Sequence, residues 1–325
     1  MTDYATHTNA AYVTHSVCSD PGPLRDWLAD APRTVAGIRR LASTLIFHYR
    51  ASGNPTDLGF EPERLDEIDL RYADAILGRA RELMPGSITD QRGDLERVLG
   101  CCRDFTLLFV ALAREAQIPS RMRIGFGGYL MRGWWLDHVI AEVWDSAAGR
   151  WALVEPQLPE GFPDQETASP LDLLDVPRDR FLVGADAWHA ARTGAIDPKR
   201  FVVDPSNPIV FLRSLPYLAH NLVMDLSAVN RREPLLWDAW SFLERFTDPN
   251  LGTAELSRDE IAALDDLAAA LAAATDPGTD PETSAVEAAA VANTSGFGIP
   301  ATVLTLSPYG RPPRRTALRS DRLAA

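Results

Sequence analysis

Cysteine is scarce in this chain, which has three cysteines among its 325 residues. These are Cys18, Cys101 and Cys102, an odd set in which two members are adjacent. Such spacing matches neither a disulfide framework nor the paired cysteines of a structural zinc site. We therefore expect free thiols, whose reactivity depends on their surroundings.

Long apolar runs and an excess of basic charge are also missing. The chain has no run of about 18 apolar residues that could cross a bilayer, and its first residues lack the basic start and apolar stretch of a secretory signal. With 45 acidic and 32 basic residues the formal charge is −13, which disfavours attraction to phosphate backbones and anionic membranes. We therefore expect a cytoplasmic protein with neither nucleic acid nor membrane as a partner. The basic segment 311–319 is interpreted as a solvated tail, with an interaction arm as the alternative.

The first third of the chain has the apolar spacing of amphipathic helices. Helical patterns begin at Thr34, near Pro62 and near Cys102. Turn-forming residues follow each of them: Ser52-Gly53-Asn54-Pro55, Pro85-Gly86 and Pro119. This part of the chain is predicted to be helical.

The middle of the chain changes to short segments rich in β-branched and aromatic residues. Three of them, RMRIGFGGYL, HVIAEVW and RWALVEP, cover 121–130, 138–144 and 150–156, and DSAAG forms a tight turn between the second and the third. We predict consecutive antiparallel strands here, followed by helical patterns at 181–194, 211–229 and 234–246. The fold class is therefore α+β, a small antiparallel sheet flanked by helices.

The two ends of the chain have different patterns from the middle. Residues 1–22 are predicted to be a flexible N-terminus, and 23–255 a single domain with a helical extension. Ser257 and Glu260 make a capping box for a helix over 256–274. Residues 275–325 are rich in Ala, Thr, Asp and Pro and have little to bury at their start, so we predict a flexible linker and tail.

Cys102 follows Gly100 and Cys101 at the predicted start of the helix RDFTLLFVALAREA. A helix N-terminus has unpaired N–H groups and partial positive charge, which stabilise a thiolate and can also hold an oxyanion. The alternative is that Cys101 and Cys102 are simply buried small apolar residues.

A histidine and a carboxylate lie on the strands that follow. If Trp144 pairs with Trp151 across the DSAAG turn, then His138 and Glu155 lie on the same face of the sheet. In that arrangement Glu155 can accept a hydrogen bond from the imidazole and fix its tautomer. The spacing therefore predicts a base with an orienting carboxylate.

These residues resemble a known family. The segments GCCRDFTLLFVALAREAQIPSRMRIGF and DHVIAEVWDSAAGRWALVEPQL resemble the transglutaminase-like core, and most closely a bacterial branch with CRDF, DHW and DAQL motifs. The likeness continues through DVPRDRFLVGADAW and LLWDAW, and so covers 23–245. It implies a papain-like cysteine-enzyme core, whose nucleophile lies at a helix N-terminus packed on a small antiparallel sheet, with additional C-terminal helices. The chain departs from the pattern at Glu155, where the family usually has Asp, and at Val139, where the branch has Trp.

The resemblance also implies roles. Cys102 precedes the Arg103-Asp104-Phe105 motif and corresponds to the nucleophile, with His138 as base and Glu155 as third member. Cys101 is then a bystander, expected to face away because neighbouring residues in a helical turn point about 100° apart.

The implied function is thiol-dependent acyl transfer, with no metal ion and no organic cofactor. The expected substrate is a small molecule, peptide or acyl-carrier conjugate with an amide, ester or thioester, and the acceptor, water or an amine, stays open. One alternative is a transglutaminase-like binding module that has lost catalysis, and a metal site built on the same residues is a weak third interpretation. Arg103 and Asp104 are expected to form local hydrogen bonds, whereas Trp134, Trp135 and Trp144 could line a cleft or pack in the core.

Overall fold

The computed structural model describes residues 10–207, 209, 212–247 and 255–320. Its central sheet has five strands, in the order β5-β4-β3-β6, with β7 parallel to one end of β4. The bounds are β3 (Ser120–Gly127), β4 (Trp135–Asp145), β5 (Arg150–Val154), β6 (Phe181–Val183) and β7 (Phe201–Val202).

The antiparallel series β3, β4 and β5 confirms the strands predicted from the sequence. Asp145 shapes the β4–β5 turn because its carboxylate accepts the backbone N–H groups of Ala147 and Ala148. Gly149 completes the turn at φ +64°, where a residue without Cβ fits best. Trp144 pairs with Trp151, and this is the register on which the placement of His138 and Glu155 depends.

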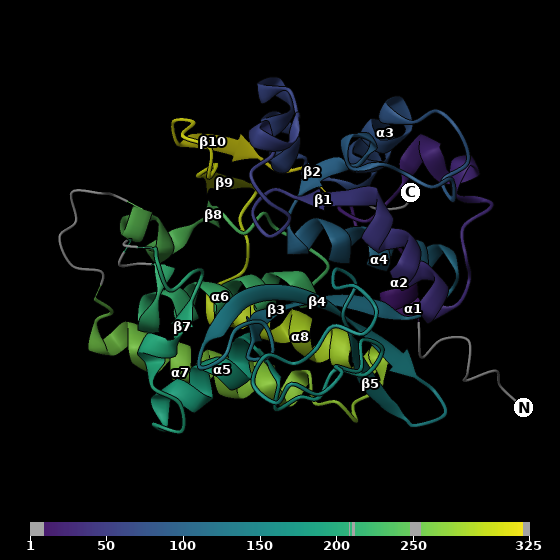
Figure 1. The fold of residues 1–325 in the computed structure, drawn as a ribbon. Helices are drawn as coiled ribbons and strands as arrows, with labels where there is room; N and C mark the ends of the chain where they lie inside the picture. Colours follow the sequence, from purple (N-terminus) through teal and green to yellow (C-terminus); the bar gives the residue numbers. More distant parts are fainter. Residues whose placement is uncertain (1–9, 208, 210–211, 248–254, 321–325) are drawn as a thin grey trace, which may run out of the picture.

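Helices surround the sheet. α4 packs against β4 and α2, and α6 packs against β3. Figure 1 shows β4 in the middle of the molecule, with α2 and α4 above it in that view and α5, α7 and α8 below. The bounds of the helices that the sequence predicted are α2 (Val35–Leu45), α3 (Ala73–Leu83), α4 (Cys102–Glu115), α5 (Gly184–Arg192), α6 (Ser214–Val229) and α7 (Arg258–Ala274).

The helix predicted to run from Thr34 to about residue 51 is shorter than expected. It ends at Leu45, and the chain continues as β1 (Ile46–His48), which pairs in parallel with β2 (Val98–Gly100). The branched and aromatic side chains of Ile46 and Phe47 fit a buried strand better than a helix. This short parallel pair leads directly into the site described below.

Two other predicted helices are also partly wrong. The segment Pro62–Asp69 forms a 3₁₀ helix that precedes α3. Between 234 and 247, β8 (Asp238–Ala239) precedes a 3₁₀ helix at Ser241–Thr247. Asp238 holds this segment extended, because its buried carboxylate accepts hydrogen bonds from Arg71 and Thr305 and from the backbone of Leu235.

The N-terminus is not loose over the part that the structure describes, and residues 1–9 lie outside it. In α1 (Ala10–Val13) Tyr12 is fully buried, donates a hydrogen bond to the carbonyl of Val229 and packs edge-on against Trp151. The segment is polar in composition, so its sequence did not indicate that Tyr12 packs in the core. The prediction of a flexible segment 1–22 is therefore wrong for residues 10–22.

The prediction of a flexible linker and tail at 275–325 is also wrong over most of its length. Asp280 caps α8 (Pro281–Ser295), and Ser284 inside that helix accepts a hydrogen bond from Arg121 of β3. The chain then adds β9 (Thr302–Thr305) and β10 (Arg314–Ala317) to β8, forming a three-stranded sheet. Small residues such as Ala288 are buried in this region, although the sequence has no long run of large apolar residues there. Composition alone therefore did not indicate that the segment packs.

The basic segment 311–319 lies on the body of the protein. Arg315 forms an ion pair with Glu244, and Arg319 pairs with Asp74 while its guanidinium lies 4.0 Å from the centroid of the Tyr72 ring. Both arginines stay solvated, as expected, with 59% and 49% of their side-chain surface exposed, but these contacts hold the segment against the protein. Across the described ranges, no helix is both long and apolar enough to span a membrane.

Candidate active site

Cys102 is the first residue of α4 and is separated from the end of β2 by Cys101 alone. The connection is tight at Gly100, where an added Cβ would lie 2.7 Å from Oδ2 of Asp104 and 3.1 Å from Cγ2 of Ile46. Asp104 caps the helix by accepting the backbone N–H of Cys101 at 2.8 Å. The thiol of Cys102 therefore has a fixed position at the helix N-terminus.

Arg103 and Asp104 stabilise this corner from inside the protein. Arg103 is fully buried, and its guanidinium donates to Asp104 at 2.9 Å and to the carbonyls of Arg71, Glu233 and Pro234. These bonds use the charged pair within the fold, which confirms the expectation of local contacts.

His138 and Glu155 meet on the sheet. Nε2 of His138 lies 2.7 Å from Oε2 of Glu155, which comes directly after β5 and is fully buried. The same oxygen accepts the hydroxyl of Tyr129 at 2.6 Å, and the other carboxylate oxygen accepts the backbone N–H of Gln157 at 2.9 Å. Because these bonds hold the carboxylate still, the imidazole bound to it has one orientation.

The charge of Glu155 determines the state of His138. Burial alone would lower the pKa of His138, but the negative charge of Glu155 and hydrogen bonds with Cys102 and Glu155 raise it to about 10. For Glu155, the positive charge and hydrogen bond of His138 outweigh burial, with Tyr129 and the Gln157 N–H assisting, so its pKa lies below the usual range. Near neutral pH His138 is therefore an imidazolium paired with a carboxylate.

The thiol of Cys102 is correspondingly acidic. A hydrogen bond from the Cys101 thiol, together with hydrogen bonds from His138 and His48 and the charge of His138, lowers the pKa of Cys102 well below its usual value despite burial. The hydrogen bond to Cys102 and burial raise the pKa of Cys101. The pKa values of the two thiols thus shift in opposite directions, and Cys102 is the more acidic of the pair.

The expectation that Cys101 faces away from the site is wrong. Both Cys101 and Cys102 line the same cavity. The reason is that Cys101 is the helix cap, with extended backbone angles φ −130° and ψ −175°, so the angular step between helical neighbours does not apply to it. Cys101 is therefore a hydrogen-bond donor to Cys102.

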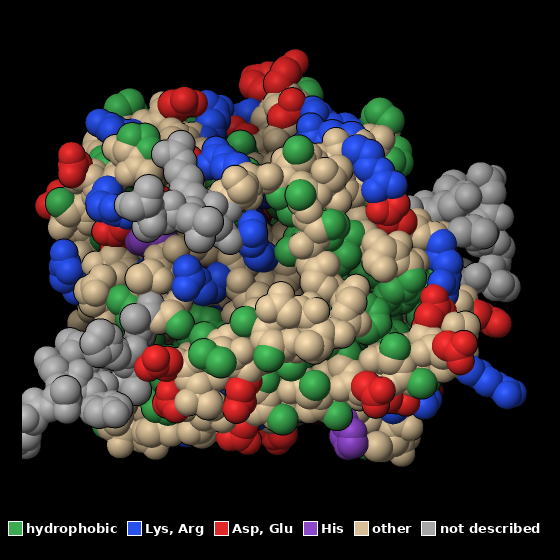
Figure 2. Space-filling view, turned by 180° about the vertical axis from the view of Figure 1, so that it is seen from behind, with side chains coloured by type: hydrophobic (Ala, Val, Ile, Leu, Met, Phe, Trp, Pro, Cys, Tyr) green, Lys and Arg blue, Asp and Glu red, His purple; other side chains and the backbone are tan. Residues whose placement is uncertain are grey.

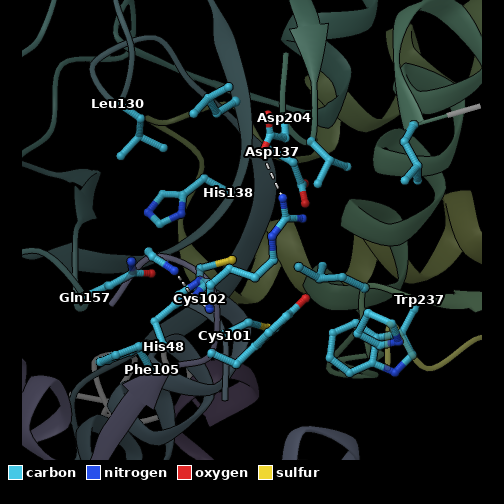
Figure 3. Close-up of a pocket in the computed structure, with 18 of the residues that line it drawn as sticks. His48, Cys101, Cys102, Phe105, Leu130, Asp137, His138, Gln157, Asp204 and Trp237 are labelled. Carbon is cyan, nitrogen blue, oxygen red and sulfur yellow. Dashed lines mark hydrogen bonds and ion pairs between the residues drawn. The ribbon is translucent and has the colours of Figure 1, made fainter. Parts of the chain in front are cut away.

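A cavity of about 1370 Å³ opens over these residues. Figure 3 shows Cys101, Cys102, His48 and His138 lying together, with Trp237 on the other side of the cavity. Further apolar lining comes from two stretches distant in the sequence: Leu130, Leu136, Leu158 and Phe162 on one hand, and Leu236, Leu243, Phe246 and Leu306 on the other. A bound molecule would contact apolar side chains from both stretches.

Asp137 is the carboxylate beside His138 that also lines this cavity. Burial and the negative charge of Cys102 raise its pKa to about 7, against hydrogen bonds from Tyr217 and Asn221. In the described part of the chain, no three His, Cys, Asp or Glu side chains form a group suited to hold a metal ion.

The sequence left open whether Trp134, Trp135 and Trp144 line a cleft or pack in the core. Trp135 stacks on Phe201, with ring centroids 5.9 Å apart, and Trp144 packs edge-on against Trp151 at 5.6 Å. Neither of these tryptophans lines the cavity, whereas Trp237 does. The core-packing interpretation is the correct one for Trp135 and Trp144.

Comparison with known proteins identifies the middle of the chain. Residues 71–156 match the model of the transglutaminase-like superfamily. They form a transglutaminase-like core. This core contains Cys102, His138 and Glu155 and ends just after β5, so its extent is narrower than the likeness over 23–245 noted from the sequence.

No curated protein matches the chain. Among solved structures, it is similar to "a Putative Cysteine Protease from Cytophaga hutchinsonii", with 16% identity and a TM-score of 0.33 over 55% of this chain and 46% of that one. The chain thus spans less than half the length of that protein.

Sequence reasoning missed three side chains around the transglutaminase-like core. The sequence predicts a strand at Tyr129 and a helix at His48 and indicates a role for neither, and Gln157, two residues after Glu155, lines the cavity. A signal for Tyr129 existed, since the hydroxyl of a buried tyrosine usually finds a hydrogen-bond partner. Locating His48 required the parallel pairing of β1 with β2, which local patterns do not encode.

Proposed function

We propose that this protein is a cysteine-dependent acyltransferase or hydrolase, with Cys102 as nucleophile, His138 as general base and acid, and Glu155 as the residue that orients His138. The observation that carries the proposal is the buried pair of His138 and Glu155, whose side chains lie 2.7 Å apart, with His138 and the Cys102 thiol lining the same cavity. Nε2 of His138 is bound to Glu155, which leaves Nδ1 as the nitrogen available to the thiol.

The proposed reaction has two halves. In the first, the Cys102 thiolate attacks the carbonyl carbon of an amide, ester or thioester, the carbonyl electron pair moves to oxygen, and the intermediate collapses to an acyl-enzyme thioester. His138 gives its proton to the leaving group. In the second half, neutral His138 takes a proton from water or an amine, which attacks the thioester and releases the thiolate.

The substrate side of the proposal rests on the cavity. Its volume exceeds the few hundred to about 1000 Å³ typical of small-ligand pockets, and apolar side chains form much of its wall. We propose a small-molecule, peptide or acyl-carrier substrate, with neither nucleic acid nor membrane as partner. On the face shown in Figure 2, Lys and Arg lie among Asp and Glu in the upper half, and Asp and Glu predominate along the lower edge.

The decisive experiment is acylation of the intact protein with p-nitrophenyl acetate. We expect a burst of about one equivalent of p-nitrophenolate and an acetyl group that mass spectrometry locates on Cys102. Cys102→Ala should remove the burst, whereas Cys101→Ala should retain its amplitude and slow it, because the Cys101 thiol lowers the pKa of Cys102. Cys18 is an internal control, because burial raises the pKa of its thiol to about 12.

The same experiment separates this proposal from a binding module that has lost catalysis. Such a module would retain the fold and give no burst. The substitution of Glu for the usual Asp does not by itself favour the module, since Glu155 reaches His138 at hydrogen-bond distance. A wild-type protein that is neither acetylated nor rapidly alkylated at Cys102 would contradict the enzyme.

A further inference from the structure

His48 is brought to the nucleophile by the short parallel strand pair. It is the last residue of β1 and pairs with Gly100, the last residue of β2, two positions before Cys102. The backbone N–H of Tyr49 donates to the carbonyl of Gly100 at 3.0 Å and extends this pairing. His48 therefore has a fixed place beside Cys102, set by backbone hydrogen bonds.

The tautomer of His48 is also fixed. Its Nδ1 accepts the backbone N–H of Arg50 at 3.1 Å and of Ala51 at 3.0 Å. A nitrogen that accepts two N–H groups carries no proton, so the ring proton is on Nε2. His48 and Cys102 line the same cavity and lie close together in Figure 3, and because Nδ1 is occupied, Nε2–H is the group that the imidazole can offer to the Cys102 sulfur.

The two histidines beside Cys102 thus have opposite surroundings. His138 contacts a buried carboxylate and can gain or lose a proton. Within the described part of the chain, His48 has no carboxylate partner among its hydrogen bonds, and its Nδ1 is occupied by two backbone N–H groups. One ring is suited to moving a proton, and the other to holding a proton in a constant direction.

We propose that His48 is a fixed N–H donor that solvates the Cys102 thiolate at rest and then holds the carbonyl oxygen of the substrate during attack. When the S–C bond forms, the negative charge moves from sulfur to the carbonyl oxygen two bonds away. A donor already directed at the sulfur needs little movement to reach that oxygen, and it acts together with the N-terminal amides of α4. No proton leaves His48 in this step. This inference rests on the proposed acyl transfer at Cys102.

The test compares two reactions of Cys102 that differ in their need for an oxyanion donor. Alkylation by iodoacetamide displaces iodide and forms no oxyanion, whereas acylation by p-nitrophenyl acetate passes through one. We measure both rates at a pH where alkylation has reached its plateau, in the wild type, His48→Leu and His48→Gln. The exposed His189 provides the matched control His189→Leu.

We expect the ratio of acylation to alkylation rates to fall about 10²-fold in His48→Leu, the effect of removing one oxyanion donor. His48→Gln has an amide N–H of similar reach and should stay within about tenfold of the wild type, while His189→Leu should match it. The apparent pKa of Cys102 should rise in His48→Leu and less in His48→Gln, because thiolate stabilisation needs the same N–H.

Three outcomes overturn the inference. An unchanged rate ratio in His48→Leu shows that the donor is not used, and equal losses in both variants show that ring shape matters rather than the N–H. If the wild type gives no acylation burst, the proposed function fails together with this role. A wild-type burst with an unaffected His48→Leu removes only the role of His48. Circular dichroism checks that each variant is folded. If His48→Leu is not folded, the test continues with His48→Gln.

Discussion

The central sheet contains two buried carboxylates with contrasting partners. Glu142, on β4, accepts hydrogen bonds from Arg121, Arg123 and Arg178 at 2.7 to 2.8 Å. Glu155, after β5, has His138 as its titratable partner, with neutral donors for its remaining bonds. Both side chains are fully buried. An arginine cluster keeps its charge at any ordinary pH, whereas a histidine can release its proton, so only the second arrangement is suited to proton transfer.

Breaking the arginine cluster should have the largest effect, and that effect should be on stability. Glu142→Gln leaves Arg123 with Asp225 as its remaining buried carboxylate and takes from Arg121 the carboxylate that it contacts. We expect the free energy of unfolding, measured by urea denaturation, to fall by about 3 to 5 kcal/mol. Alkylation of Cys102 per folded molecule should not change.

The control for this variant is Glu63→Gln, at an exposed position, which should alter the free energy of unfolding by less than about 0.5 kcal/mol. A stable Glu142→Gln protein with slow Cys102 alkylation would reverse the contrast and show that the arginine cluster supports the chemistry.

Breaking the ion pair of His138 with Glu155 should act mainly on the reactivity of Cys102. Glu155→Gln retains the shape and removes the charge that raises the pKa of His138. The apparent pKa of Cys102, read from the pH dependence of iodoacetamide alkylation, should then rise toward about 8.5, the value of a free cysteine. Glu155→Asp should keep much of the reactivity because it keeps the charge. An unchanged pH profile in Glu155→Gln would mean that Glu155 does not orient His138.

The ion pair of His138 with Glu155 and the arginine cluster around Glu142 should also stabilise the fold over different pH ranges. The pKa of His138 is raised to about 10, so its contribution is complete below its ordinary value of 6.5 and is lost as pH rises through about 10. The three arginines lower the pKa of Glu142 against burial, so its contribution is complete above its ordinary value of 4.5 and is lost in acid.

Urea denaturation at several pH values checks this difference. The stability gap between the wild type and His138→Gln should narrow from pH 6.5 to pH 10, while the gap to Glu142→Gln should stay constant over that range. NMR of the imidazole ring gives a direct reading, and a His138 pKa near 6.5 would contradict the proposed ion pair.

The smallest effect is expected at Tyr129. Tyr129→Phe removes one hydrogen bond to the Glu155 carboxylate and leaves the contact with His138 in place. A hydrogen bond to a charged group contributes about 1.5 to 3 kcal/mol. We therefore expect the free energy of unfolding to fall by about 1.5 kcal/mol and the apparent pKa of Cys102 to rise slightly. A loss of reactivity as large as that of Glu155→Gln would show that the tyrosine is part of the proton-transfer unit.

The sequence was informative where contacts are local. The cap at Asp104, the DSAAG turn and the pairing of Trp144 with Trp151 involve residues close in the chain, so their geometry follows from short-range rules. His48 and Gly100 pair across 52 positions through strands of three residues each, and such short strands have no periodicity to detect.

Composition was least informative near the C-terminus. Alanine-rich α8 looked like a linker, and the path of the segment around Asp238 depends on Arg71 and Thr305, which are far away in the sequence. Contacts of this kind select one structure from several that the local sequence permits. The residues of the transglutaminase-like core were found, whereas their surroundings required the structure.

The distance along the chain between the nucleophile and one cavity wall has a consequence for synthesis. Tyr309 lines the cavity and packs against Tyr49, with ring centroids 5.4 Å apart, although the ribosome adds it 207 residues after Cys102. At about 5 to 20 residues per second, roughly 10 to 40 seconds separate the two additions. Throughout that time the nascent chain has its thiol but lacks this part of the wall, so the complete cavity forms only late in translation.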